Sequence, residues 1–143
     1  MRYRYLEDIA TADVAFEAFG DTLEEVMVAS ADATINVMVA DLDSIADRLR
    51  RRIEVEAGGA DMLLYALLEE LVYHKDAERV LLRVPSVCIE ERGAGLVLRA
   101  EAYGETMDPS RHRLLVDVKA VTLHHFCVEH TGAGWRATVV LDI

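Results

Sequence analysis

The carboxylates at the end of the chain are the groups best placed to do chemistry. The sequence ends in the apolar run Val139-Val140-Leu141, followed by Asp142 and Ile143, a pattern typical of a β-strand. Side chains alternate between the two faces of a strand, so Ile143 continues the apolar phase and Asp142 points the other way. If the Ile143 side chain packs in the core, the main-chain carboxylate is held beside the carboxylate of Asp142.

Two carboxylates held this close repel each other unless a cation lies between them. Oxygen ligands alone suit hard cations such as calcium and magnesium. A terminal metal site is therefore one hypothesis for Asp142 and Ile143. The alternative, which the alternation alone favours, is a plain surface aspartate near the end of the chain.

Other catalytic patterns are absent from the sequence. It contains no phosphate-binding glycine loop, no Gly-rich dinucleotide turn, no nucleophile elbow and no Cys-x-x-Cys pair. Metal ligands on one face of a strand are two residues apart, so the adjacent His124 and His125 are expected on opposite faces and do not favour a zinc site. The residues themselves therefore give no support for a hydrolase.

Composition and charge limit the classes of partner. The 143 residues, 52% of them hydrophobic, suffice for one domain with a core and are too few for two, so we expect a single domain over residues 1–143. The 26 acidic and 15 basic residues give a formal net charge of −11, which repels nucleic-acid phosphates. We therefore expect no direct sequence-specific binding of nucleic acid, and a basic protein surface or a cation as the partner.

The sequence also predicts where the protein works. No apolar run approaches the roughly 18 to 20 residues of a membrane-spanning helix, and the first residues lack the apolar segment of a signal peptide. We expect a cytoplasmic protein without membrane association. In that reducing compartment Cys88 and Cys127 are expected to be small buried hydrophobic residues.

Hydrophobic periodicity predicts two helices among several strands. Residues 13–19 alternate loosely as a strand, and the Thr22 and Glu25 that follow have the spacing of a capping box. Asp61 is placed to cap a second helix, and from Val80 onward the period changes to alternation. The predicted order is β-α-β-α-β-β-β-β, an α+β fold with two helices packed on one face of a mostly antiparallel β-sheet.

Several local motifs, spread in order over nearly the whole chain, match those of one family. They are Thr11-Ala12-Asp13, Gly20-Asp21-Thr22-Leu23-Glu24-Glu25, Asp61-Met62-Leu63-Leu64-Tyr65 with Glu69-Glu70-Leu71-Val72-Tyr73, Ala102-Tyr103-Gly104-Glu105, His112, Val118-Lys119-Ala120-Val121-Thr122 with His124, and the final Asp142-Ile143. With these motifs the sequence resembles the archease family.

The resemblance implies a role and a set of ligands. Archeases are known as partners of the RtcB-type RNA ligase, which joins tRNA exons and broken RNA ends with GTP through a guanylated histidine. The resemblance implies an accessory protein, not an enzyme, that promotes guanylation and multiple turnover of that ligase. It also implies that Asp13, Asp142 and the carboxylate of Ile143 bind a divalent cation, with calcium expected and magnesium or manganese as alternatives.

Other residues of the matched motifs are candidates for supporting the site or contacting the partner. Their simpler interpretation, as strand residues with local hydrogen bonds, stays open. These candidates are His112, Lys119, Thr122 and His124. Two positions depart from the family pattern, since Ala10 stands where a histidine is usual and Leu123 where a tyrosine is common. Loss of that histidine would remove one supporting group from the metal site.

Two further functions remain open from the sequence. One is a chaperone or modulator of tRNA-modifying enzymes such as methyltransferases, a role also associated with the family. The other is a small metal-dependent hydrolase that uses the same carboxylates, although no nucleophile or general base is evident.

Overall fold

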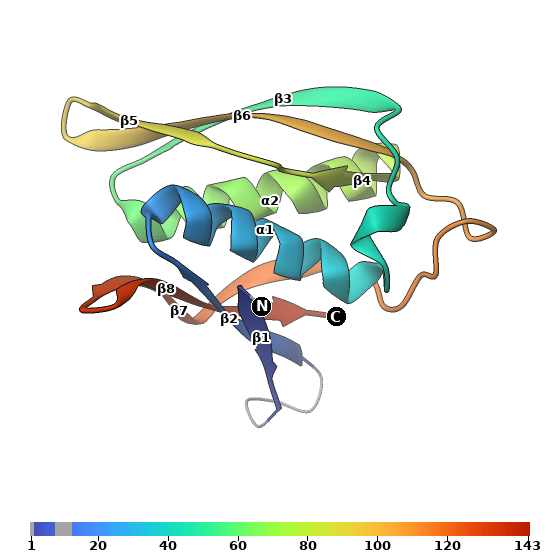
Figure 1. The fold of residues 1–143 in the computed structure, drawn as a ribbon, viewed down its shortest axis with the longest axis horizontal. Coiled ribbons are helices and arrows are strands. Elements are labelled where there is room, and N and C mark those ends of the chain that lie inside the picture. Colours follow the sequence, from blue (N-terminus) through green and yellow to red (C-terminus); the bar gives the residue numbers. More distant parts are fainter. Residues whose placement is uncertain (1, 8–12) are drawn as a thin grey trace.

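Two helices lie between two antiparallel sheets in the computed structural model, which describes residues 2–7 and 13–143 (Figure 1). The elements are β1 (Tyr3–Leu6), β2 (Asp13–Gly20), α1 (Leu23–Met38), a 3-10 turn (Leu42–Ser44), β3 (Leu49–Ala57), α2 (Ala60–Glu78), β4 (Val80–Arg83), β5 (Cys88–Arg92), β6 (Gly95–Thr106), β7 (Ala120–Thr131) and β8 (Gly134–Asp142). The departure at Ala10 and the first two residues of the Thr-Ala-Asp motif lie outside the described residues.

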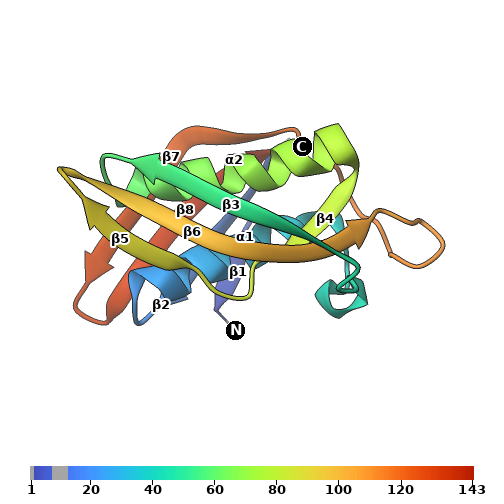
Figure 2. The same ribbon diagram turned by 90° about the horizontal axis from the view of Figure 1, so that it is seen from above.

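The strands form two sheets. The first sheet has the order β1-β2-β8-β7, and the second has β3-β6-β4 with β5 also paired to β6. Every pairing within them is antiparallel. Figure 2 shows the second sheet lying across the helices. The predicted α+β class, with two helices and antiparallel strands, is confirmed, and the structure adds that the helices are covered on both sides.

The first helix begins at the predicted capping box. The Thr22 hydroxyl accepts a hydrogen bond from the Glu25 N–H, and the Glu25 carboxylate accepts one from the Thr22 N–H, each 3.1 Å long. These two bonds satisfy N–H groups that a helix start otherwise leaves without a partner. The helix is rich in small residues, including Ala29, Ala31 and Ala33, because it is buried between two sheets.

The second helix extends beyond its buried apolar residues, which run from Leu63 to Val72, at both ends. Gly59 occupies the N-cap position without a side-chain hydrogen bond, so the prediction that Asp61 caps the helix is wrong. Asp61 lies instead in the first turn, where its charge is favourable at the positive end of the helix dipole. The helix ends at Glu78, and the C-cap residue Arg79 has a left-handed φ of 56°.

The apolar side chains of both helices and the inner strand faces form one core. It includes Phe16, Ile53, Leu67 and Val139, each at most 1% exposed. The cysteines differ from expectation, because Cys88 is exposed on β5 and Cys127 is half-buried on β7, both as free thiols. Among the described residues, no helix is long and apolar enough to cross a membrane.

Candidate metal centre

Asp13 and Asp142 lie directly opposite each other at one end of the first sheet. Asp13 is the first residue of β2 and pairs with Asp142, the last residue of β8. Directly opposed residues project to the same face, with Cβ atoms roughly 4.5 to 5.5 Å apart. Both side chains are half-buried. The structure therefore brings together two predicted ligands that are far apart in the sequence.

The backbone of Asp142 is held from both sides. On the side away from Asp13 it pairs with Ala120, and its carbonyl oxygen accepts a hydrogen bond of 2.8 Å from the Lys119 N–H. The next residue, Ile143, is half-buried and packs against the core, as its strand phase predicts. The main-chain carboxylate thus follows directly on a fixed strand end.

Asp13 and Asp142 are two like charges at directly opposed positions. In the part of the chain that the structure describes, neither Asp13 nor Asp142 forms an ion pair with a basic side chain. Like charges directly opposite on a sheet are destabilising. No group of three His, Cys, Asp or Glu side chains within residues 2–7 and 13–143 could hold a metal ion. A site here therefore needs a main-chain oxygen besides the two side chains, and such an all-oxygen set fits a hard divalent cation.

Thr122 and His124 lie on β7, and Thr122 pairs with Val140, two residues before Asp142. The Thr122 hydroxyl donates to the Val140 carbonyl oxygen at 3.0 Å and accepts from the His124 N–H at 3.3 Å. The strand is irregular here and His125 has a φ of 56°, so the two histidine rings lie side by side with centroids 4.2 Å apart. The expectation that they point to opposite faces is wrong, because it assumed a regular strand.

His112 is 1% exposed, so it is not available for direct contact with a partner. Its Nδ1 accepts a hydrogen bond of 2.9 Å from the Asp108 N–H, which places the ring proton on Nε2. That Nε2 lies 3.2 Å from a carboxylate oxygen of Glu105, within ion-pair range but outside hydrogen-bond geometry. His112 therefore anchors the connection between β6 and β7.

Glu105, a buried carboxylate on β6, is the centre of that anchor. It accepts hydrogen bonds from the Ala46 N–H and from Arg111, whose Nη2 lies 2.9 Å away. Burial alone would raise the pKa of Glu105, but the Ala46 N–H, His112 and Arg111 together outweigh it and lower that pKa. Sequence reasoning matched Glu105 to a motif without giving it a role.

Lys75 is a second buried charge that sequence reasoning missed. Its side chain is 3% exposed, and its Nζ donates to the Val118 carbonyl oxygen and to Asp117, each at 2.7 Å, and also to Asp76. These bonds tie α2 to the residues that lead into β7, next to a cavity of about 330 Å³. The signal was present, because Lys75 stands four residues after Leu71 on the apolar stripe of α2.

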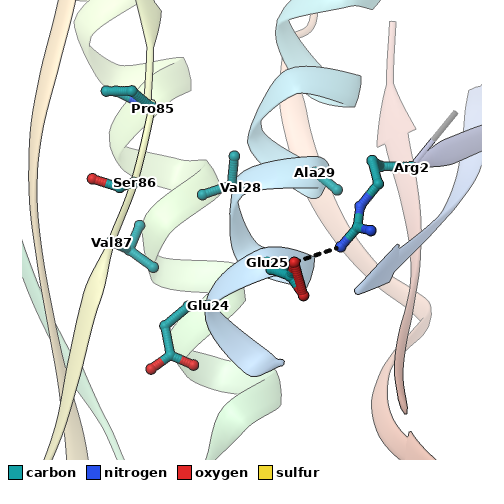
Figure 3. A pocket seen from close by; sticks show the side chains of 8 residues that line it. All are labelled: Arg2, Glu24, Glu25, Val28, Ala29, Pro85, Ser86 and Val87. Atoms are coloured by element: carbon teal, nitrogen blue, oxygen red, sulfur yellow. Dashed lines mark ion pairs between the residues drawn. The ribbon is translucent and has the colours of Figure 1, made fainter. Parts of the chain in front are cut away.

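A separate cavity of about 250 Å³ lies at the start of α1 (Figure 3). Val28 and Ala29 of the helix line it together with residues 85–87, and Arg2 contacts Glu25 at 3.3 Å across its edge. None of the predicted site residues lines this cavity. It is therefore distinct from the carboxylate pair.

Comparison with known proteins places the chain in one family. Residues 3–143 match the archease protein family. The chain is 40% identical over 134 residues to the protein archease of Pyrococcus furiosus, covering 93% of this chain and 94% of the relative. It is 34% identical over 143 residues to the protein archease of Methanosarcina mazei, covering 99% and 96%.

Solved structures agree with this placement. The fold is similar to the solution structure of Methanobacterium thermoautotrophicum protein 1598, with a TM-score of 0.85, 31% identity and 99% of each chain covered. An archease from Thermotoga maritima, described as a possible chaperone, is similar in fold at a TM-score of 0.61 and 16% identity, covering 96% of this chain and 97% of that one. Since the family match extends over nearly the whole sequence, the chain belongs to the archease protein family.

Proposed function

We propose that this chain is a cytoplasmic accessory protein of an RtcB-type RNA ligase in tRNA splicing and RNA repair. It promotes guanylation and multiple turnover of the ligase through a divalent cation held by the acidic edge, by which we mean Asp13, Asp142 and the carboxylate of Ile143. The observation that carries this proposal is the direct opposition of Asp13 and Asp142 without a basic partner among the described residues. Membership of the archease family supports the choice of partner.

The contribution of this chain is to position a divalent cation at the ligase active site. When bound, a divalent cation supplies positive charge for phosphate oxygens at the ligase active site. The pairing of β2 with β8 fixes the two aspartates, and the Lys119 N–H fixes the Asp142 backbone. The ligase histidine is the nucleophile, so the accessory protein needs none of its own.

The direct test is multiple-turnover ligation by a cognate ligase with and without this protein. We expect the ligase alone to stop after about one turnover and to continue when the protein is added in substoichiometric amounts. Equal product with and without the protein, with both proteins shown to be folded, would exclude the accessory role.

The cation site has its own test, which needs no ligase. Asp142→Asn and Asp13→Asn should each weaken calcium binding at least about tenfold, because the charge count of the ligands sets affinity. Asp61→Asn, at an exposed position on α2, is the matched control and should bind as the wild type does. Titration calorimetry with calcium, magnesium and manganese measures this. Unchanged binding in both aspartate variants would show that the ligands are elsewhere.

The Ile143 carboxylate is tested by adding one residue after it. The extension leaves every side chain in place and moves the main-chain carboxylate away, so binding should fall as in Asp142→Asn. Full binding by the extended protein would remove Ile143 from the ligand set.

A second candidate is a chaperone or modulator of tRNA-modifying enzymes such as methyltransferases. It is favoured by the description of the Thermotoga maritima archease as a possible chaperone. Affinity capture from the native cell separates the two, because the accessory role predicts recovery of the ligase and the chaperone role predicts methyltransferases or mixed clients.

A further inference from the structure

Strand β7 is interrupted beside the acidic edge. Thr122 and Cys127 pair with Val140 and Thr138, so the four residues Leu123–Phe126 face a single residue of β8. We call these four residues the β7 bulge. Bulges re-aim side chains and are frequent next to functional sites.

The bulge is held in an unusual backbone conformation. His125 has a φ of 56°, a left-handed value that is uncommon for residues other than glycine. The Thr122 hydroxyl fastens the start of the bulge by bonding to the Val140 carbonyl oxygen and the His124 N–H. Such strained positions persist where the surroundings fix them, and they cluster at functional sites.

This conformation divides the bulge into an inner and an outer part. Phe126 turns inward, with its ring 5.8 Å from that of Tyr65. Leu123 is 58% exposed, and His124 and His125 are exposed beside it. The bulge thus presents one large apolar side chain and two imidazoles to solvent.

The charge of the bulge differs from that of the rest of the chain. Residues 118–128 contain no carboxylate, although the chain has 26 acidic residues. The centres of protein interfaces are depleted of charged residues. Another exposed leucine, Leu115, differs because a carboxylate, Asp117, lies two residues away in the sequence.

The bulge begins close to the acidic edge on the first sheet. Thr122, the residue just before the bulge, pairs with Val140, and Val140 is two residues from Asp142. Two residues along a strand span roughly 7 Å. A partner that reaches the carboxylates therefore comes close to the bulge.

We propose that the β7 bulge is the docking element that seats the acidic edge on the ligase. Leu123 enters an apolar recess beside the ligase active site, and the two imidazoles hydrogen-bond to acidic or carbonyl groups at its rim. This inference rests on the proposed function and assigns the contact surface that the carboxylates do not supply.

The test compares two exposed leucines. Leu123→Asp should lower the affinity for the ligase at least about tenfold, as expected for an apolar side chain central to an interface. Leu115→Asp, at a position 51% exposed, is the matched control and should stay within about twofold of the wild type. Both variants should keep the melting temperature and the calcium affinity of the wild type.

The outcomes separate this inference from the proposed function. If the wild type does not bind the ligase, the proposed function fails and the docking element with it. If the wild type binds and Leu123→Asp binds equally well, only the docking element is wrong. A change in the molar mass of the free protein in Leu123→Asp, without a change in ligase affinity, would assign the bulge to self-association and overturn the proposal. His124→Ala, which keeps Leu123, should weaken binding in the same direction, and wild-type affinity would exclude the imidazole contact.

Discussion

Two buried charged side chains hold the connection between β6 and β7 near its two ends. Glu105 binds Ala46, Arg111 and His112, and Lys75 binds the residues just before β7. Burying a charge is costly unless it is paired and hydrogen-bonded, and both of these are. The connection ends at Lys119, whose N–H holds Asp142, so these two residues fix the approach to the acidic edge.

Glu105 should give the protein a recognisable acid response. Because its pKa is lowered in the folded state, its ionised form stabilises the fold above the ordinary carboxyl pKa of 4.5. This stabilisation is lost as the pH falls below that value through the folded-state pKa. At pH 7, Glu105→Gln should lower the free energy of unfolding by about 1.5 to 3 kcal/mol, the range for hydrogen bonds to charged groups.

Urea denaturation at pH 7 and at low pH measures this difference. The difference in the free energy of unfolding between wild type and Glu105→Gln should become smaller at low pH. Glu56→Gln, at an exposed position, should have the stability of the wild type at both pH values. If the difference in the free energy of unfolding stays constant with pH, the charge of Glu105 does not stabilise the fold.

At the scale of elements, β6 is the strand on which the second sheet depends. It pairs with β3 on one side and with β4 and β5 on the other. At Gly104 the backbone of β4 approaches so closely that an added Cβ would lie 1.9 Å from the Leu81 carbonyl oxygen. A glycine is therefore required there for close strand approach and not for a turn.

Gly104→Ala should destabilise the protein by at least about 3 kcal/mol, since the clash is with backbone that cannot rotate away. Gly58→Ala is the control, because nothing lies within 4 Å of its added Cβ, and it should be nearly neutral. Thermal and urea melts of both variants test this, and equal stability would mean that β4 can shift without loss.

At the scale of the whole molecule, the formal net charge of −11 favours association with a positively charged partner surface. An acidic protein is steered toward a basic surface such as the RNA-binding face of a ligase, and salt screens that attraction. The uncharged β7 bulge would then act only at short range, after the encounter.

The association rate with the ligase should therefore fall about tenfold or more between low and high salt, while the dissociation rate changes little. Stopped-flow measurements across a salt series provide the readout. An association rate independent of salt would show that the net charge does not steer this complex.

The sequence by itself determined the features that depend on residues close together in the chain, namely the start of α1 and the buried face of the last strand. Thr22 and Glu25 sit three residues apart, so their reciprocal capping is readable without a fold, and α1 begins where they predict. Alternation likewise placed Ile143 against the core. These features follow from the side-chain periodicity of helices and strands, which can be read from a short stretch of sequence.

Only the tertiary structure decided which strands meet and at what register. Alternation gives the face of a side chain but not its partner, so the opposition of Asp13 and Asp142 and the division into two sheets depend on long-range pairing. The bulge at His125 and the hydrogen-bond partners of Lys75 and Glu105 likewise depend on long-range packing. Each arises where segments far apart in the sequence pack together, a relation that local pattern does not contain.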